Sequence, residues 1–408
     1  MIKHAATAAV IVLGLASASQ ALEFQALGTG SLGVGGAGVA RNYGAMAPYW
    51  NPAGLAFAPK TVTVSLSVGA GIKPEGMLAQ DLDSLSTTQS AWNSDQSDPG
   101  KAQSLANALN SLIDTTAKDN LRLTAGAALG AQVQHFGFGV YGTFEGGAIP
   151  NPGGTKLPTD AASLVGLTSD QIKTDLGSKT ISVRGIGLVE VPLSYGYAFD
   201  LGAAGKLGVG ASAKYLYGEA TAKDNEQVFN SGSNSTTSSS DLTHDLSKSM
   251  KGSSSFGIDL GVLWKPFAST AFGLVAKNLN SPSFSTASGE KIAVGRQVRA
   301  GVSFEPLSWL ELTGDVDVLS NSTIVPGINS QHLGGGAEFH PFSCLKLRAG
   351  GYTDLVASTS GAVTGGLSLG IPWLFFDIDG AYGLGTVRYD NKSYPTEAKV
   401  QFSTNLAF

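Results

Sequence analysis

Apolar and polar residues alternate one by one over many segments of the chain, beginning with TVTVSLSVGAGI at residues 61–72. Successive side chains of a β-strand point to opposite faces, so such a segment has one apolar face and one small polar face. This alternation is longer than most globular strands and suits a tilted strand that crosses a bilayer. It recurs along the chain and predicts about 14 strands, at residues 61–72, 121–133, 136–147, 180–199, 207–217, 256–264, 271–279, 296–304, 310–318, 332–340, 345–352, 362–371, 373–382 and 397–408.

The connections between these segments alternate between short and long. Turns of a few residues follow every second strand, whereas the intervening connections are longer and carry polar or glycine-rich sequence. An up-and-down barrel of the bacterial outer membrane has this alternation and an even number of strands. We therefore expect an all-β fold, a transmembrane antiparallel β-barrel of about 14 strands with both termini on the side of the short turns.

Aromatic residues lie beside the short turns, where a membrane barrel carries a girdle at the lipid–water interface. The residues are Phe136, Phe199, Phe267, Trp309, Phe342, Trp373 and Phe408. No segment after the N-terminal one has 18 consecutive apolar residues, so the sequence predicts no membrane-spanning helix.

Both ends of the chain carry signals of export and membrane insertion. Residues 1–21 have a cationic start, a short apolar run and small residues before Ala21, which predicts a cleavable signal peptide. The last strand places Phe402, Leu406 and Phe408 on one face and resembles the C-terminal strand by which outer-membrane proteins are recognised for insertion. We expect the outer membrane of a Gram-negative bacterium as the location, with its lipid and the barrel-assembly machinery as partners.

Composition narrows the function classes. Charged residues make up 14% of the chain, there are 54 glycines, and the net charge of -5 gives no reason to expect nucleic acid as a partner. Cys344 is the single cysteine, so no intramolecular disulfide can form. The five histidines have no metal-binding or catalytic spacing. The sequence therefore predicts no cofactor, no metal and no enzyme.

Residues 22–60 do not alternate and contain a formal G-x-G-x-x-G at Gly33, Gly35 and Gly38. A dinucleotide site would need a preceding strand, a following helix and an acidic residue about 20 positions on. Prolines interrupt any helix here, and no Asp or Glu lies between Gly38 and Lys60. A barrel of this size needs a plug if it is not to leak, so we expect residues 22–60 to form a hatch inside the barrel of residues 61–408.

Charged residues on the polar faces would line the barrel lumen. Folding the strands about their short turns predicts two cross-strand pairs, Arg299 with Asp315 and Glu338 with Arg348. Structural ion pairs within the wall and between the wall and the hatch are favoured over an ion-selective pathway, which stays open as an alternative.

The glycine-rich run GTGSLGVGGAGVA at 28–40, followed by PYWNPAGL at 48–55, resembles the FadL/TodX superfamily of outer-membrane transporters, and its TraF-like/PorV-like branch most. This resemblance implies a monomeric 14-stranded barrel with an N-terminal hatch. It places Asn51, Pro52 and Ala53 in the hatch against the third strand, where Gly137, Gly139 and Gly142 could permit a kink or local unpairing. A turn that ends the hatch is an equal alternative for Asn51-Pro52.

The resemblance implies passive uptake of hydrophobic small molecules, fatty-acid-like or aromatic, through the plugged lumen. The alternative is a PorV/TraF-like component of protein secretion, surface assembly or conjugal transfer, with secreted proteins as partners. No basic residue matches a carboxylate-binding group of the transporters. An insert at about 78–118 has helical spacing at 102–113, which suits a packing helix in the first outer loop better than an apolar pocket.

Overall fold

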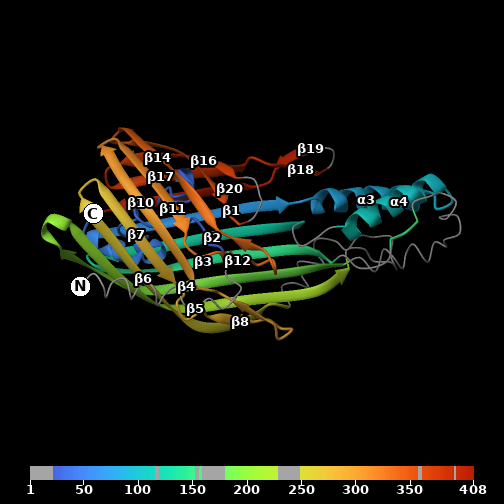
Figure 1. The fold of residues 1–408 in the computed structure, drawn as a ribbon, viewed down its shortest axis with the longest axis horizontal. Coiled ribbons are helices and arrows are strands. Elements are labelled where there is room, and N and C mark those ends of the chain that lie inside the picture. Colours follow the sequence, from blue (N-terminus) through green and yellow to red (C-terminus); the bar gives the residue numbers. More distant parts are fainter. Residues whose placement is uncertain are drawn as a thin grey trace.

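The computed structural model describes residues 22–114, 119–151, 156–158, 180–227, 249–356, 361–389 and 392–408. The predicted signal peptide, residues 1–21, lies outside the described residues, as does the end of the predicted insert at 115–118. Figure 1 shows long strands wrapped into an elongated barrel, with helices α3 and α4 projecting beyond one end. No helix in the described ranges is both long and apolar enough to cross a membrane.

In the described part of the chain, fourteen strands form one closed antiparallel barrel, and the last strand pairs with the first. The strands are β1 (Val62–Glu75), β2 (Asn120–Val133), β3 (Phe136–Asn151), β4 (Thr180–Asp200), β5 (Lys206–Gln227), β6 (Lys251–Phe267), β7 (Thr270–Lys277), β10 (Gln297–Leu307), β11 (Leu310–Asp317), β14 (His332–Phe342), β15 (Leu345–Asp354), β16 (Ala362–Ile371), β17 (Leu374–Gly383) and β20 (Ala398–Ala407). The predicted transmembrane up-and-down barrel is confirmed.

The two faces of the wall differ as the alternation predicts. Leu66, Val68 and Leu193 point outward and are 54%, 56% and 65% exposed. Ser65 and Ser67, which alternate with Leu66 and Val68 along β1, point inward and are each 1% exposed. An apolar exterior of this kind matches the lipid that surrounds a membrane barrel.

Strands β4, β5 and β6 are longer than the apolar alternation. β5 continues from Tyr217 to Gln227, and β6 begins at Lys251, before the predicted start at Phe256. Alternation ends where lipid contact ends, but the hydrogen-bonded ladder needs only backbone groups and continues into polar sequence. The strands therefore extend past the apolar band.

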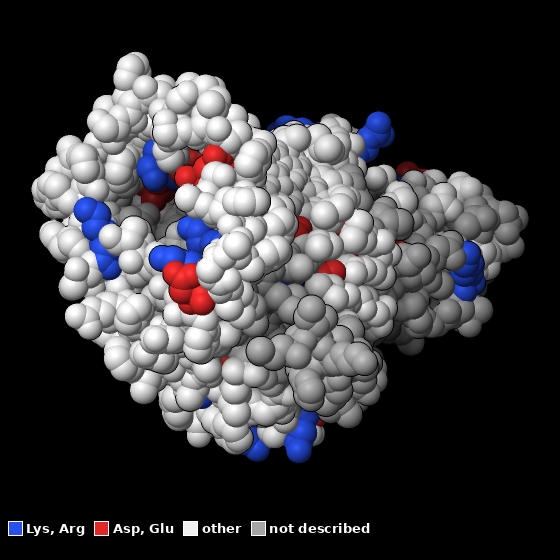
Figure 2. All heavy atoms as spheres, turned by 60° about the vertical axis from the view of Figure 1, so that its left-hand side comes forward, with Lys and Arg blue, Asp and Glu red and all other residues white. Residues whose placement is uncertain are grey.

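The predicted aromatic girdle lies on the exterior at the end of the barrel that carries the short turns. Its members Phe136, Phe199, Phe267, Trp309, Phe342, Trp373 and Phe408 are all exposed. Figure 2 brings this end forward and shows a largely uncharged wall around a hollow in which acidic and basic residues gather. Apolar and charged surface are thus separated, outside and inside.

Long connections at the opposite end, called here the outer end, form small hairpins and a helical pair. Hairpins β8–β9 (Ser283–Ser285, Lys291–Ala293) and β12–β13 (Asn321–Ser322, Asn329–Ser330) bury Phe284, Ile292 and Ile324 against Ile186 and Leu216 of the wall. A third hairpin, β18–β19 (Thr386–Tyr389, Lys392–Pro395), lies nearer α3. These connections cover part of the outer end.

Helices α3 (Leu78–Ser94) and α4 (Pro99–Asp114) occupy the predicted insert. They pack on each other through a separate apolar cluster that includes Leu85, Trp92, Leu105 and Leu109. Asn110 of α4 also exchanges two 2.8 Å hydrogen bonds with the backbone of Leu157. The apolar face of α4 is thus used for packing, as the helical spacing favours.

Residues 22–60, called here the luminal segment, lie inside the barrel (Figure 1, dark blue). Their regular elements are brief: η1 (Leu32–Val34), α2 (Ala47–Trp50) and η2 (Pro52–Phe57). A further turn of helix, η3 (Gly202–Ala204), lies in the short connection between β4 and β5. The luminal segment is almost entirely buried, because the wall surrounds it.

Candidate functional site in the barrel lumen

Aromatic residues form the centre of the luminal segment. The rings of Phe24, Tyr49 and Trp50 contact one another, with centroids 5.0–5.9 Å apart. Tyr49 also contacts Tyr141 of β3, at 5.3 Å. Two backbone carbonyls satisfy the polar groups, since Tyr49 donates to Gln25 and Trp50 donates to Leu27. The cluster is thus fixed in place and reaches the wall at β3.

The glycines of the G-x-G-x-x-G run allow close approach of the segment to the wall and to itself. Gly35 has a φ of 73°, and a Cβ there would overlap backbone atoms of Gly335 and Gly351. A Cβ at Gly38 would overlap the Trp50 ring. These glycines therefore serve packing of backbone on backbone, and the strand, helix and acidic residue of a nucleotide site do not accompany them.

Asn51 connects the luminal segment to the wall. Its amide donates to the carbonyl of Val39 at 3.1 Å and to that of Val262 in β6 at 3.2 Å, while its side-chain oxygen accepts from the N–H of Ala53. Pro52 begins η2, where its missing N–H costs nothing. The motif both caps η2 and attaches it to β6.

The wall strands that contact η2 are not the predicted ones, because the prediction placed this motif against the third strand. η2 lies mainly on β4, β5 and β6, and much less on β3. A Cβ at Gly210 or Gly261 would overlap Pro52 or Asn51, so the wall is glycine-lined where the motif docks. Close to the motif, Pro48 and Leu55 lie over Gly137 of β3.

The third strand is continuous from Phe136 to Asn151, but its ladder with β4 is interrupted at one of the predicted glycines. Gly139 and Val140 have no partners on β4, although the register on both sides of them is the same. That register places Gly139 opposite Pro192, which has no N–H to donate. The break is therefore one missing ladder hydrogen bond, caused by a proline in β4.

Tyr141 covers this interruption from the lumen. A Cβ at Gly139 would lie 2.8 Å from the Tyr141 ring, and the Tyr141 hydroxyl donates to Ala45 of the luminal segment at 3.3 Å. Gly142, the third predicted residue, pairs with Val189, and a Cβ there would meet only one backbone oxygen, at 3.8 Å. The three glycines thus do not act together: Gly137 and Gly139 adjoin the lumen, and Gly142 does not.

Lumen-facing charges form buried networks that include the luminal segment. Glu338 and Arg348 face each other in the register of β14 and β15 and are 2.5 Å apart. Arg41 of the luminal segment pairs with Glu311 at 2.8 Å and with Glu338 at 2.9 Å. Burial would lower the pKa of Arg41, but these two carboxylates outweigh it and raise the pKa. Arg41 thus joins the segment to the wall as a permanent cation.

Arg299 pairs with Asp317 at 2.6 Å and not with Asp315, the predicted partner. The ladder of β10 and β11 aligns Arg299 with Asp317 because the turn closes at the pair Leu307 and Leu310, later in the chain than a pairing with Asp315 requires. Asp315 instead accepts hydrogen bonds from the backbone N–H groups of Gly38 and Val39, at 2.8 and 3.0 Å. Its carboxylate holds the luminal segment.

Glu23 holds the start of the luminal segment near the outer end. Its carboxylate pairs with Arg122 of β2, and its N–H donates to Glu145 of β3 at 3.3 Å. Burial would raise the pKa of Glu23, but the positive charges of Arg122, Lys73 and Lys399 outweigh it and lower the pKa to about 2. Glu23 is therefore an anion at neutral pH.

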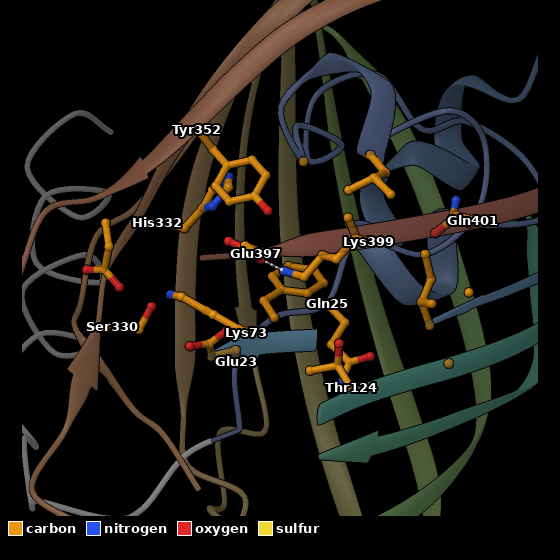
Figure 3. A pocket seen from close by; sticks show the side chains of 18 of the residues that line it. Glu23, Gln25, Lys73, Thr124, Ser330, His332, Tyr352, Glu397, Lys399 and Gln401 are labelled. Carbon is orange, nitrogen blue, oxygen red and sulfur yellow. Dashed lines mark ion pairs between the residues drawn. The ribbon is translucent and has the colours of Figure 1, made fainter. Parts of the chain in front are cut away.

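A cavity of about 100 Å³ lies between the start of the luminal segment and the wall. Figure 3 shows Glu23, Lys73, Lys399 and Glu397 around it, with Lys399 and Glu397 paired. The side of the cavity formed by the luminal segment also includes apolar residues, namely Phe24, Leu27 and Leu32. Its lining is thus mixed, charged on the wall and partly apolar on the segment.

Two histidines have structural partners in the lumen: His332 contacts the carbonyl of Gly35 at 3.0 Å, and His340 contacts Glu338 at 2.6 Å. Among the described residues, no group of three or more His, Cys, Asp or Glu is arranged to hold a metal ion. The candidate site is therefore the luminal segment with the cavity above it and the weakened β3–β4 ladder beside it.

A closed wall with an apolar exterior defines a transmembrane β-barrel, and here its lumen contains the N-terminal segment. The chain belongs to the family described as "F plasmid transfer operon, TraF, protein", which matches residues 48–317. No curated protein sequence matches the chain.

Solved structures of similar fold are transport channels. The toluene transporter TodX of P. putida is 12% identical, with a TM-score of 0.52 over 93% of this chain and 97% of that one. The toluene transporter TbuX of Ralstonia pickettii is 14% identical, with a TM-score of 0.52 over 95% and 100%. The monoaromatic hydrocarbon channel CymD is 14% identical, with a TM-score of 0.54 over 95% and 99%. At these identities the likeness establishes the fold.

Proposed function

We propose that this protein is a barrel of the Gram-negative outer membrane through which hydrophobic small molecules pass without catalysis or an energy source. The luminal segment acts as a hatch, residues 22–60, that prevents free flow through the barrel of residues 61–408. The protein functions as a monomer in lipid and reaches the membrane through the barrel-assembly machinery, with Phe402, Leu406 and Phe408 as the insertion signal. The channels of similar fold are toluene transporters and a monoaromatic hydrocarbon channel, which supports this class of substrate.

The proposed path runs from the cavity to the weakened ladder. Phe24 lines the cavity, contacts Tyr49 at 5.5 Å, and Tyr49 contacts Tyr141 at 5.3 Å. Tyr141 lies behind the position where β3 and β4 lack a hydrogen bond. Three adjoining aromatic side chains thus connect the cavity with the wall. An apolar molecule that displaces them one after another would leave the barrel between β3 and β4 and enter the lipid.

The missing bond between Gly139 and Pro192 is the observation that carries this proposal. Pro192→Val restores the N–H and, with it, a ladder hydrogen bond worth about 0.5–1.5 kcal/mol. We expect this variant to slow the uptake of radiolabelled toluene by a complemented deletion strain several-fold. Pro150→Val is the matched control, because Pro150 lies in β3 and retains its partner Ile181. Equal uptake by Pro192→Val, Pro150→Val and wild type would refute the lateral path.

A second candidate function is supported by the family match. The family is named after the transfer operon of the F plasmid, which favours a role in conjugal transfer, secretion or surface assembly. Helices α3 and α4 project past the barrel and would be available to protein partners (Figure 1). Mating frequency of a deletion strain distinguishes the two: it falls if this second function holds and is unchanged if the protein only passes small molecules.

A further inference from the structure

The ring of Phe24 is surrounded by two cations and two aromatic rings. The Lys277 ammonium lies 4.3 Å from its centroid and the Arg299 guanidinium 4.5 Å. Tyr49 lies edge-on, with an interplanar angle of 62° at 5.5 Å, and Trp50 is tilted at 5.0 Å. We call these four residues the ring site. Cations within about 6 Å of a ring centroid attract its π-electron face.

Lys277 is unusual among the buried charges of the lumen. It is 3% exposed, and among the described residues no carboxylate lies within ion-pairing distance of its ammonium. Its neighbour Lys214, in contrast, pairs with both Glu190 and Asp259. The ammonium of Lys277 instead faces the rings of Phe24 and Tyr49, at 4.3 and 3.9 Å. A buried ammonium without an anion is costly unless another group stabilises it.

Arg299 is held in a fixed orientation toward the same ring. Its Nε donates to Asp317 at 2.6 Å, which leaves the flat guanidinium directed at Phe24. Arginine stacks on aromatic faces because its guanidinium is planar and weakly hydrated. The ring site therefore selects its occupant by π-electrons as well as by shape.

We propose that the ring site is a binding site for a neutral aromatic ring, and that Phe24 occupies it as an internal substitute for that ligand. The proposal rests on the proposed passage of hydrophobic molecules and names the class that is preferred: aromatic over saturated hydrocarbons. An arriving ring displaces Phe24 and takes over its contacts with the Lys277 ammonium and the Arg299 guanidinium. A saturated ring of the same size fills the space but supplies no such contact.

Access to the ring site comes from the cavity, since both Phe24 and Arg299 line it. Phe24 belongs to the first described residues of the luminal segment and is anchored by neighbours rather than by its own polar bonds. Its side chain can therefore leave without breaking a hydrogen bond. From the ring site, the bound ring next displaces the adjoining Tyr49 and then reaches Tyr141.

Phe24→Ala tests the proposal because it empties the ring site. The purified variant, in lipid nanodiscs, is equilibrated with toluene or with methylcyclohexane through the vapour phase, and bound ligand is measured by gas chromatography against empty nanodiscs. Affinities are compared after correction for each compound's partition into alkane. We expect toluene to bind at least about fivefold tighter than methylcyclohexane, as one or two cation–π contacts would give.

Two further variants show whether the cations cause the preference. Phe24→Leu keeps the space filled with an aliphatic side chain, and we expect it to bind neither compound above background. Phe24→Ala combined with Lys277→Met keeps the space but removes the unpaired ammonium. We expect the ratio of the corrected affinities, toluene over methylcyclohexane, to fall to less than about half of its value in Phe24→Ala alone. Should Phe24→Ala not give a heat-modifiable folded barrel, Phe24→Val repeats the comparison with less volume removed.

Equal corrected affinities for toluene and methylcyclohexane, or a preference unchanged by Lys277→Met, would overturn the proposal. Neither outcome depends on uptake in cells, so the proposed function can survive the failure of the ring site. Conversely, normal toluene uptake by a deletion strain would refute the proposed function while the binding preference in nanodiscs could still be observed. The two claims are thus tested by separate measurements.

Discussion

Asn51 satisfies three backbone groups with one side chain, so a small change there has a large expected effect. Asn51→Asp retains an acceptor for Ala53 but cannot donate to the carbonyls of Val39 and Val262. Two buried acceptors then lose their donor beside a new negative charge, at a cost of about 2–4 kcal/mol. We expect faster hydrogen exchange in residues 22–60 and unchanged exchange in the barrel ladder.

Asn280→Asp is the matched control for this prediction. Asn280 also donates its amide to a backbone carbonyl, that of Phe256 at 2.7 Å, but at an exposed position where water can replace the bond. Its effect on exchange in the luminal segment should be negligible. If Asn51→Asp behaves like Asn280→Asp, Asn51 does not anchor the segment.

The charge of Glu23 predicts how the luminal segment responds to acid. The pKa of Glu23 is lowered from 4.5 to about 2 by Arg122, Lys73 and Lys399, against the opposing effect of burial. A carboxyl whose pKa is depressed in the folded state contributes stability above its ordinary pKa and loses it as the pH falls toward the folded value. We expect protection of the amides near Phe24 to fall as the pH is lowered from 4.5 to about 2.

Glu23→Gln separates this effect from other acid effects. A glutamine cannot titrate, so the variant should have lower protection at neutral pH and a flatter dependence on pH in the same range. Hydrogen exchange read by peptic digestion and mass spectrometry gives both quantities. A variant whose pH dependence matches that of wild type would contradict the assignment of this transition to Glu23.

At the scale of elements, alternation predicts faces but not register. It placed Glu338 and Arg348 on the lumen face of adjacent strands, and they pair there. It also placed Arg299 and Asp315 there, yet the turn closes at Leu307 and Leu310, and the ladder therefore aligns Arg299 with Asp317. The register depends on how backbone hydrogen bonds close a turn, which residue type indicates only weakly.

The family resemblance predicted that Asn51, Pro52 and Ala53 lie in the lumen, but it did not predict what they contact. Residues 51–53 lie in the lumen, as expected, but on β4–β6 rather than on β3. Gly210 and Gly261 accommodate them, and in sequence these glycines are indistinguishable from the many others in the wall. The unpairing at Gly139 lies in the third strand, as expected, but its cause is Pro192 on the neighbouring strand rather than the glycine itself.

Helices α3 and α4 form an element whose stability is separate from that of the barrel. Leu109 is 0% exposed and packs only within the helical cluster, so Leu109→Ala should destabilise the helix pair by about 2–5 kcal/mol. We expect the helical circular dichroism signal to melt earlier while the barrel keeps its heat-modifiable migration. Asn107→Ala on the exposed side of α4 is the control, and a joint loss of helix and barrel would contradict the separation.

At the scale of the whole molecule, the barrel was predictable because a bilayer leaves few alternatives. Backbone groups in lipid must bond within the protein, so alternating strands have to close on themselves. The arrangement inside the lumen was less predictable. Polar and charged groups there are paired by side chains of the wall and of the luminal segment, and sequence alone does not specify which groups pair. Residue type therefore predicted that charges line the lumen, but the structure was needed to show that Arg41 enters their network.

Removing residues 22–60, while retaining residues 1–21, should leave a closed barrel with an open and charged lumen. The ladder that closes the wall runs through β1 and β20 and does not include the luminal segment. Without Arg41, carboxylates outnumber basic residues on the β10–β17 side of the lumen: Glu311, Asp315, Asp317, Glu338, Asp377 and Asp379 against Arg299, Lys346 and Arg348.

An excess of negative charge in a narrow passage concentrates cations. In planar bilayers we expect steady conductance with a preference for potassium over chloride from the deletion variant, and little conductance from wild type. Arg41→Met in the intact chain is the control: it removes the same charge but leaves the lumen filled, so conductance should stay low. A deletion variant that is closed would show that residues 22–60 do not plug the lumen, and one that conducts but prefers chloride would contradict the excess of negative charge.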